Sequence, residues 1–138
     1  MTRYYVDTSI WRDLHENRKD NLRPLGEWAF ELFRKIRIHK DTVLYSDSVM
    51  EELLRYYTRA EANDTLCISA DYEILHRINT TDEQIKEAVV LSRTLKIPSG
   101  DCLHAVLARD AKAVMVTRDA HFEQLRFIAD VKKPEELI

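Results

Sequence analysis

The stretch Arg3-Tyr4-Tyr5-Val6-Asp7-Thr8-Ser9 joins a short apolar segment to three polar residues. Aromatic and β-branched residues favour a β-strand over Arg3–Val6. The following residues, from Thr8 to Glu16, have the pattern of a helix. A strand that leads directly into a helix is typical of a parallel sheet, and it places Asp7 at the carboxyl end of the first strand.

Further along the chain, short apolar segments alternate with longer segments whose apolar residues recur every three or four positions. Further strands are predicted at Thr42–Tyr45, Thr65–Ser69 and Ala113–Thr117, with a possible edge strand at Phe127–Ile128. The segment Tyr72–Ile78 fits either a strand or a helix. Further helices are predicted over Leu25–His39, from Asp47 to about Ala62, from about Thr80 to Leu95, over Asp101–Asp110 and over Ala120–Leu125.

Two residue pairs have the spacing of a capping box, in which the first and fourth residues of a helix start hydrogen-bond each other's backbone. These pairs are Ser48 with Glu51 and Thr80 with Glu83. The break at residues 97–100 contains a proline and a glycine, so Ser99 or Gly100 is expected to cap the helix that follows.

Strands separated by helices need crossover connections, which make the strands parallel and place helices on both faces of the sheet. The 138 residues suit one domain, which we expect to span 1–138. The predicted fold class is therefore α/β: a three-layer α/β/α sandwich with a central, mainly parallel sheet.

Composition excludes several classes of protein. The only glycines, Gly26 and Gly100, stand far apart, so neither a P-loop nor a dinucleotide-binding glycine motif is present. A formal net charge of −3 argues against nucleic-acid binding by bulk attraction. No apolar run approaches the roughly 20 residues that cross a bilayer. The two cysteines do not form a disulfide framework, so we expect a cytoplasmic protein with no membrane partner.

Acidic residues fall repeatedly at one edge of the predicted sheet. Asp7 and Asp119 follow strands, Asp101 lies in the first turn of a helix, and Glu51 and Glu52 lie in the helix after the second strand. Converging carboxylates repel one another unless a cation compensates them, and oxygen ligands suit Mg²⁺ or Mn²⁺. Such ions activate water and stabilise a departing phosphodiester oxygen. The pattern indicates metal-dependent phosphodiester hydrolysis.

Two other interpretations of these residues stay open. Acids at the starts of helices also serve as caps, which fits Asp7, Asp101 and Asp119, while Glu51 fits the capping box. Side chains that bind zinc in other proteins lie beside the acids: Cys102, His104 and His121.

Taken together, the motifs resemble the PIN-domain family. The segments that carry the resemblance keep the family's order and spacing over essentially the whole chain: Tyr5–Ser9, Glu52-Leu53, Gly100–Ala105 and Val116–Phe122. Proteins of this family are small metal-dependent ribonucleases, and many short prokaryotic ones are VapC-type toxins of toxin–antitoxin pairs. The resemblance implies a PIN-like fold, an endoribonuclease that uses Mg²⁺ or Mn²⁺, RNA as the substrate, a possible antitoxin partner and a homodimer.

The resemblance also implies four acids that bind the metal and act in catalysis: Asp7, Glu52, Asp101 and Asp119. Two polar residues, Ser9 and Thr117, would hydrogen-bond these ligands or metal-bound waters. The family places an acid immediately before Leu or Ile, which selects Glu52 over Glu51. Adjacent helical residues point about 100° apart, so only one of the two glutamates can face the cluster.

Two questions remain open at this level. Many family members carry another acid just after the last motif, where Ala120 and His121 stand here and Glu123 is the nearest carboxylate, so the number of metals is one or two. The second question is whether the fold serves as a non-catalytic RNA-binding or assembly module. Stabilisation by Mn²⁺ would distinguish a working metal site from such a scaffold.

Overall fold

The computed structural model describes residues 1–68 and 73–138. Within these ranges the chain forms one five-stranded sheet of order β3-β2-β1-β4-β5. All four strand pairs are parallel, which confirms the predicted α/β class. The strands are β1 (Arg3–Val6), β2 (Thr42–Tyr45), β3 (Leu75–Arg77), β4 (Val114–Val116) and β5 (Asp130–Lys132).

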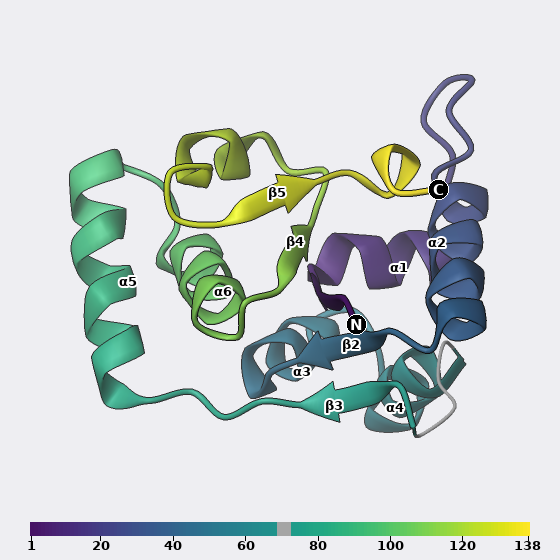
Figure 1. Ribbon diagram of the computed structural model, residues 1–138, viewed down its shortest axis with the longest axis horizontal. Coiled ribbons are helices and arrows are strands. Elements are labelled where there is room, and N and C mark those ends of the chain that lie inside the picture. Colours follow the sequence, from purple (N-terminus) through teal and green to yellow (C-terminus); the bar gives the residue numbers. More distant parts are fainter. Residues whose placement is uncertain (69–72) are drawn as a thin grey trace.

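Helices cover both sides of the sheet. Figure 1 shows the sheet crossing the middle of the molecule, with α5 and α6 on its left and α1 and α2 on its right. The α-helices are α1 (Thr8–Glu16), α2 (Leu25–His39), α3 (Asp47–Leu53), α4 (Arg59–Ile68), α5 (Asp82–Leu95) and α6 (Ser99–Asp110). Two 3₁₀-helices, η1 (Ala120–Leu125) and η2 (Pro134–Glu136), flank β5.

The central strand β1 is the best-buried part of the sheet. Tyr5 and Val6 are fully buried, as are Trp11 of α1 and, nearly so, Phe33 of α2. The Nε1 atom of Trp11 donates to the carbonyl of Val6 at 3.1 Å, and its ring lies 4.9 Å from that of Phe33. Burial of these large side chains fixes α1 and α2 against β1. Asp7 stands at the junction of β1 and α1.

Gly26 allows α2 to begin directly against the end of α1. A Cβ at this position would lie 2.5 Å from the Cα of Asn17 and 2.7 Å from the carbonyl oxygen of Asp13. Both neighbours are backbone atoms, so they cannot move away cheaply. The Gly26 amide donates to the carbonyl of Arg18 at 2.9 Å, which fastens the loop between the two helices.

The helix predicted from Asp47 to about Ala62 is two helices, because α3 ends at Leu53 and α4 begins at Arg59. Thr58 and Glu61 explain the new start. The Glu61 amide donates to the Thr58 hydroxyl at 3.2 Å, and the Thr58 amide donates to the Glu61 carboxylate at 3.1 Å. These reciprocal bonds form a capping box that starts a second helix.

The predicted strand at Thr65–Ser69 is wrong. Residues 65–68 belong to α4, and Ser69 lies outside the described residues. Thr65 and Leu66 are buried, whereas Cys67 is exposed, so the burial pattern is helical and not alternating. A short apolar run has too few residues to distinguish the helical period of about 3.6 from the strand period of about 2, so the sequence pattern alone does not exclude a strand here.

The capping box predicted for Ser48 and Glu51 is also wrong. Helix α3 begins at Asp47 after Ser46 as its N-cap, so Ser48 is already inside the first turn. The Ser46 hydroxyl makes no cap hydrogen bond and instead pairs with the hydroxyl of Tyr5 at 2.7 Å.

The second predicted capping box lies one residue further along the chain. Thr81 and Gln84 form it, in place of Thr80 and Glu83. The Gln84 amide donates to the Thr81 hydroxyl at 3.2 Å, and the Thr81 amide donates to Gln84 Oε1 at 2.8 Å. Glutamine accepts the backbone bond as well as glutamate does, which explains why the two frames look alike in the sequence.

Helix α6 begins at Ser99 with Pro98 as its N-cap, so neither Ser99 nor Gly100 is the cap. A proline fits this place because the first amides of a helix have no partner within the helix. Asp101 therefore lies in the first turn, as predicted.

The last strand is displaced from its predicted place. The residues Phe127–Ile128 lie in a turn after η1, and Phe127 is 67% exposed. The edge strand is β5, which buries Val131 and pairs with β4. At the other edge, β3 occupies part of the segment Tyr72–Ile78 whose type the sequence leaves open; Tyr72 itself lies outside the described residues.

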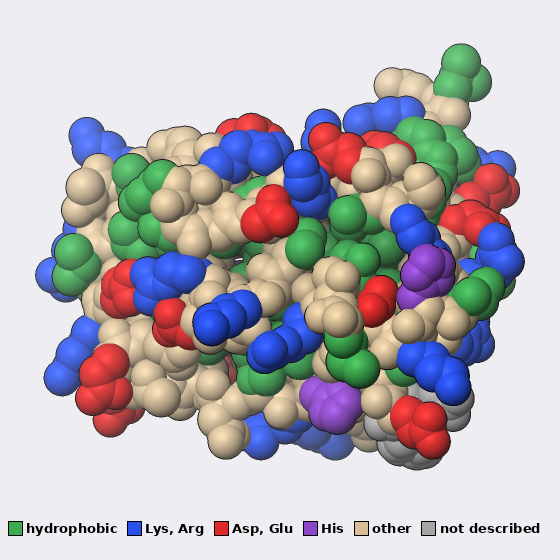
Figure 2. Space-filling model, in the orientation of Figure 1, with side chains coloured by type: hydrophobic (Ala, Val, Ile, Leu, Met, Phe, Trp, Pro, Cys, Tyr) green, Lys and Arg blue, Asp and Glu red, His purple; other side chains and the backbone are tan. Residues whose placement is uncertain are grey.

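In the described ranges, no helix has the length and apolar character needed to cross a membrane. Basic and acidic side chains are interspersed on the face drawn in Figure 2, with no large area of one sign.

Candidate functional site

The acids predicted to form the quartet line one pocket. The pocket has a volume of about 530 Å³ and lies beyond the carboxyl ends of the central strands. Each acid comes from a different connection: Asp7 follows β1, Glu52 lies in α3 after β2, Asp101 lies in the first turn of α6, and Asp119 follows β4. Glu51 is exposed and does not line the pocket.

Asp7 is the most buried of the four acids, with 7% exposure. It occupies the N-cap position of α1, but its side chain makes no cap hydrogen bond. Its Oδ2 atom instead accepts from the hydroxyls of Ser9 and Thr117, each at 2.9 Å. Burial raises the pKa of Asp7 above its usual value, against the opposing effects of His104 and the two hydroxyls.

Glu52 is held by a hydrogen bond at each carboxylate oxygen. His104 Nε2 lies 2.8 Å from Oε1, and the hydroxyl of Thr8 donates to Oε2 at 2.5 Å. Burial acts to raise the pKa of Glu52. The hydrogen bonds from His104 and Thr8, together with the charges of His104 and Arg55, outweigh burial, so the pKa lies below its usual value. Glu52 is therefore fixed in position as a carboxylate.

His104 connects this carboxylate to the interior of the protein. Its ring is fully buried, and Nδ1 lies 2.7 Å from the hydroxyl of Tyr5, which in turn lies 2.7 Å from Ser46 Oγ. Burial acts to lower the pKa of His104, but Glu52, Asp7 and Asp101 raise it overall. A chain of four side chains thus runs from Ser46 in the core to Glu52 at the pocket.

The other two acids meet at a second histidine. His121 Nδ1 lies 2.9 Å from Oδ2 of Asp101 and 3.4 Å from Oδ1 of Asp119. Asp119 also caps η1, because its Oδ1 accepts from the His121 amide at 2.9 Å, as the capping interpretation predicted. Burial and the charges of Asp119 and Asp7 raise the pKa of Asp101, against the bond from His121.

Within residues 1–68 and 73–138, the potential metal ligands form two groups of three, one made of Asp7, Glu52 and His104 and the other of Asp101, Asp119 and His121. In each group, one ligand atom from every residue lies within 4.8 Å of the others. A set dominated by carboxylate oxygens suits a hard divalent cation. Among the described residues, Cys102 is buried and belongs neither to the pocket lining nor to the two groups of potential ligands.

Ser9 and Thr117 both contact the acids of the pocket. Both donate to Asp7, and the Thr117 hydroxyl also accepts from the Asp119 amide at 3.1 Å. Thr117 therefore connects two of the four acids through one buried oxygen atom. Such outer hydrogen bonds hold metal ligands in one orientation.

Seven residues that line the pocket are not among the predicted site residues: Thr8, Arg12, Arg55, Tyr56, Pro98, Ser99 and Gly100. The guanidinium of Arg12 lies 3.6 Å from the centre of the Tyr56 ring. Helical spacing was the available signal, since Arg12 follows Thr8 by four positions and Arg55 follows Glu52 by three. Both arginines are thereby brought to the rim of the acidic pocket.

Comparison with solved structures shows the same fold in proteins of low sequence identity. VapBC2 of Rickettsia felis, bound to a DNA fragment from its promoter, has a TM-score of 0.68 at 16% identity, covering 96% of this chain and 98% of that chain. FitAcB of Neisseria gonorrhoeae has a TM-score of 0.64 at 14% identity, covering 97% and 99%. VapBC-1 of nontypeable Haemophilus influenzae has a TM-score of 0.63 at 15% identity, with the same coverage.

No curated protein matches the chain by sequence. A sequence model described as "PIN domain", however, matches residues 4–128, which include all four acids of the pocket. The match covers most of the chain, and the fold agrees with it. This protein belongs to the PIN-domain family.

Proposed function

We propose that this protein is an endoribonuclease that depends on Mg²⁺ or Mn²⁺ and acts as the VapC-type toxin of a toxin–antitoxin pair. The observation that carries the proposal is the convergence of Asp7, Glu52, Asp101 and Asp119 on one pocket. The proposal rests further on membership of the PIN-domain family.

The residues of the pocket fit a divalent cation. Burial and mutual repulsion raise the pKa values of Asp7 and Asp101, which indicates carboxylates that are costly to keep charged without a cation. The proposed ligands are Asp7, Glu52, Asp101 and Asp119, and the nearby histidines offer nitrogen atoms. When bound, the cation supplies charge neutralisation and an acidified water for attack on a phosphodiester.

The chain's own residues then have separate tasks. The hydroxyls of Ser9 and Thr117 hold Asp7 in one orientation, and Thr8 and His104 do the same for Glu52. Arg12 and Arg55 at the rim carry the positive charge that an RNA backbone needs on approach to an acidic pocket. Ordered acids with adjacent cations suit a substrate that is a polyanion.

The toxin assignment is supported by the structural neighbours. The Rickettsia felis and Haemophilus influenzae neighbours carry the VapBC name, and another is named as a toxin–antitoxin complex from Klebsiella pneumoniae, with a TM-score of 0.65 at 17% identity. An antitoxin protein is the partner that this likeness suggests, and a homodimer remains a prediction. A short neighbouring reading frame that encodes a DNA-binding protein would support the toxin assignment.

The experiment that tests the nuclease proposal compares the purified chain with its Asp101→Asn variant on labelled single-stranded RNA in Mn²⁺. Asparagine keeps the shape of the side chain and removes its charge. We expect the parent chain to cut the RNA and the variant to lose most of the activity while both remain folded by circular dichroism. Equal cleavage by the two proteins would overturn the proposed role of the acids. A chain that binds no Mn²⁺ and cuts no RNA would instead be a scaffold.

A further inference from the structure

A second pocket lies against the acidic one and has the opposite character. Its volume is about 430 Å³, and it shares Ser9 and Asp119 with the acidic pocket. Three cationic side chains line it, from the loop after α1 and from the residue before Asp119: Arg18, Lys19 and Arg118. Apart from Asp119, its one acidic lining residue is Asp13.

A buried carboxylate at this pocket positions the two arginines. Asp13 is 2% exposed, and its Oδ1 accepts from Arg18 Nε at 2.8 Å. Its Oδ2 lies 3.9 Å from Arg118 Nε. Arg18 Nη2 also donates to the carbonyl of Ser9 at 3.0 Å. Two guanidinium groups from distant parts of the chain are thus held beside one carboxylate.

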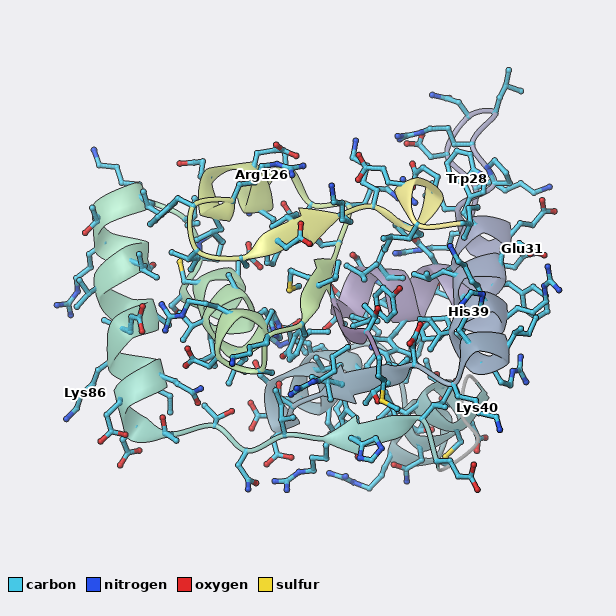
Figure 3. The ribbon with its side chains drawn as sticks, viewed as in Figure 1. Trp28, Glu31, His39, Lys40, Lys86 and Arg126 are labelled. Carbon is cyan, nitrogen blue, oxygen red and sulfur yellow. The ribbon has the colours of Figure 1, made fainter. Side chains whose placement is uncertain are left out.

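Arg118 has donors that the protein does not use. Its side chain is 12% exposed, and Nη1 donates to Glu135 at 2.6 Å. The Nε and Nη2 atoms are buried and find no hydrogen-bond acceptor among the described residues. The guanidinium lies 5.5 Å from the centre of the Trp28 ring, on α2 at the upper right of Figure 3. Buried donors without an acceptor are costly, and an anion that approaches the guanidinium would supply the missing acceptor.

The loop that carries the other two cations is held by backbone bonds. The Arg18 amide donates to the carbonyl of Asp13 at 3.1 Å, and the Gly26 amide donates to the carbonyl of Arg18 at 2.9 Å. Lys19 is exposed, and no ion pair involves it within residues 1–68 and 73–138. Asp13 and the partly buried Glu135 pair with the two arginines, which leaves the charge of Lys19 free to meet an anion.

We propose that this basic pocket binds a backbone phosphate of the RNA substrate, next to the phosphodiester that enters the acidic pocket. The inference rests on the proposed function and adds to it a fixed position for the strand. Guanidinium groups bind phosphate oxygens through paired N–H donors, and Lys19 adds a point charge. A backbone contact of this kind reads no base, so the pocket would set the register of the strand without sequence preference.

The test measures RNA binding apart from RNA cleavage. Fluorescein-labelled single-stranded RNA is titrated with each protein in Ca²⁺, and gel electrophoresis confirms that the RNA stays intact. The test variants are Lys19→Gln, which removes an exposed charge, and Arg118→Lys, which keeps the charge but removes the paired donors. The control is Lys86→Gln, because Lys86 is an exposed lysine on α5 at the opposite end of the molecule (Figure 3).

We expect Lys19→Gln and Arg118→Lys to weaken RNA binding by about threefold or more, and Lys86→Gln to leave it unchanged. For Lys19→Gln, the slope of log K against log salt should fall by about 0.7, the value for one phosphate contact on a single strand. Affinities and slopes equal to those of the parent chain would overturn the proposal, as would an equal loss in Lys86→Gln. Weakened binding by a chain that cuts no RNA in Mn²⁺ would leave the phosphate site standing and remove the nuclease proposal.

Discussion

His104 Nε2 lies 2.8 Å from Oε1 of Glu52, and this contact joins α6 to α3. The histidine is fully buried, so the carboxylate that it holds cannot turn outward without leaving a ring nitrogen unpaired. Glu51, one position earlier, is exposed. Two neighbouring glutamates thus have entirely different surroundings.

This difference predicts different effects of the same substitution. Glu52→Gln should weaken Mn²⁺ binding by at least about tenfold and remove most RNA cleavage, because it removes a proposed ligand charge. Glu51→Gln should keep both properties. Calorimetric Mn²⁺ titration and cleavage of the same RNA by both variants make the comparison direct. An inactive Glu51→Gln beside a working Glu52→Gln would show that the ligand is assigned to the wrong residue.

Asp7→Asn should separate stability from metal binding. Asparagine Oδ1 accepts the bonds from Ser9 and Thr117, and the buried charge is removed. Without metal, the variant should therefore be as stable as the parent chain or more so at neutral pH. Mn²⁺ should raise the melting temperature of the parent chain and not that of the variant. Asp64→Asn, at an exposed acid of α4, is the control that should behave as the parent does.

The difference in stability between the parent chain and Asp7→Asn should depend on pH with a definite sign. Burial holds the pKa of Asp7 above its unfolded value of about 3.9, so the folded chain binds more protons than the unfolded chain between the two pKa values. This stability contribution is present below about pH 4 and is lost as the pH rises through the folded pKa. The advantage of Asp7→Asn should therefore grow from pH 4 to pH 7 in urea unfolding without metal. A variant less stable by several kcal/mol at pH 7 would make Asp7 a structural residue.

Thr117→Val tests the oxygen atom that connects Asp7 and Asp119. Thr65→Val is its control, because Thr65 is also buried and its hydroxyl donates to the carbonyl of Glu61 in its own helix, at 2.7 Å. Each variant should lose about 1 kcal/mol of unfolding free energy with one hydrogen-bonding hydroxyl. Thr117→Val alone should also weaken Mn²⁺ binding by about 10- to 100-fold. Equal Mn²⁺ affinity in the two variants would contradict the positioning role of Thr117.

The sequence was sufficient for the fold class because its strongest signals are local. The apolar segments at β1, β2 and β4 are bounded by polar residues, and helices with clear periodicity separate them. Parallel strands then bring their carboxyl ends to one edge, which is why the pocket could be anticipated from Asp7 and Asp119. The roles of the four acids in metal binding and catalysis stay predictions.

The errors arose where local pattern is weak or where distant contacts decide. The segment around Leu66 has the composition of a strand, but its short apolar run fits the helical period equally well. The strand β5 has a weak signal because Val131 is its one buried residue. The chain of bonds from Tyr5 through His104 to Glu52 joins residues far apart in sequence. No spacing within a single element could reveal it.

The central claim is that the acidic pocket binds a divalent cation on which RNA cleavage depends. The most direct measurement follows cleavage of single-stranded RNA by the parent chain in Mn²⁺, after excess EDTA, and after Mn²⁺ is restored beyond the chelator. We predict cleavage that stops with EDTA and returns with Mn²⁺, because the cation supplies both the acidified water and the charge neutralisation. Undiminished cleavage in EDTA would contradict the account.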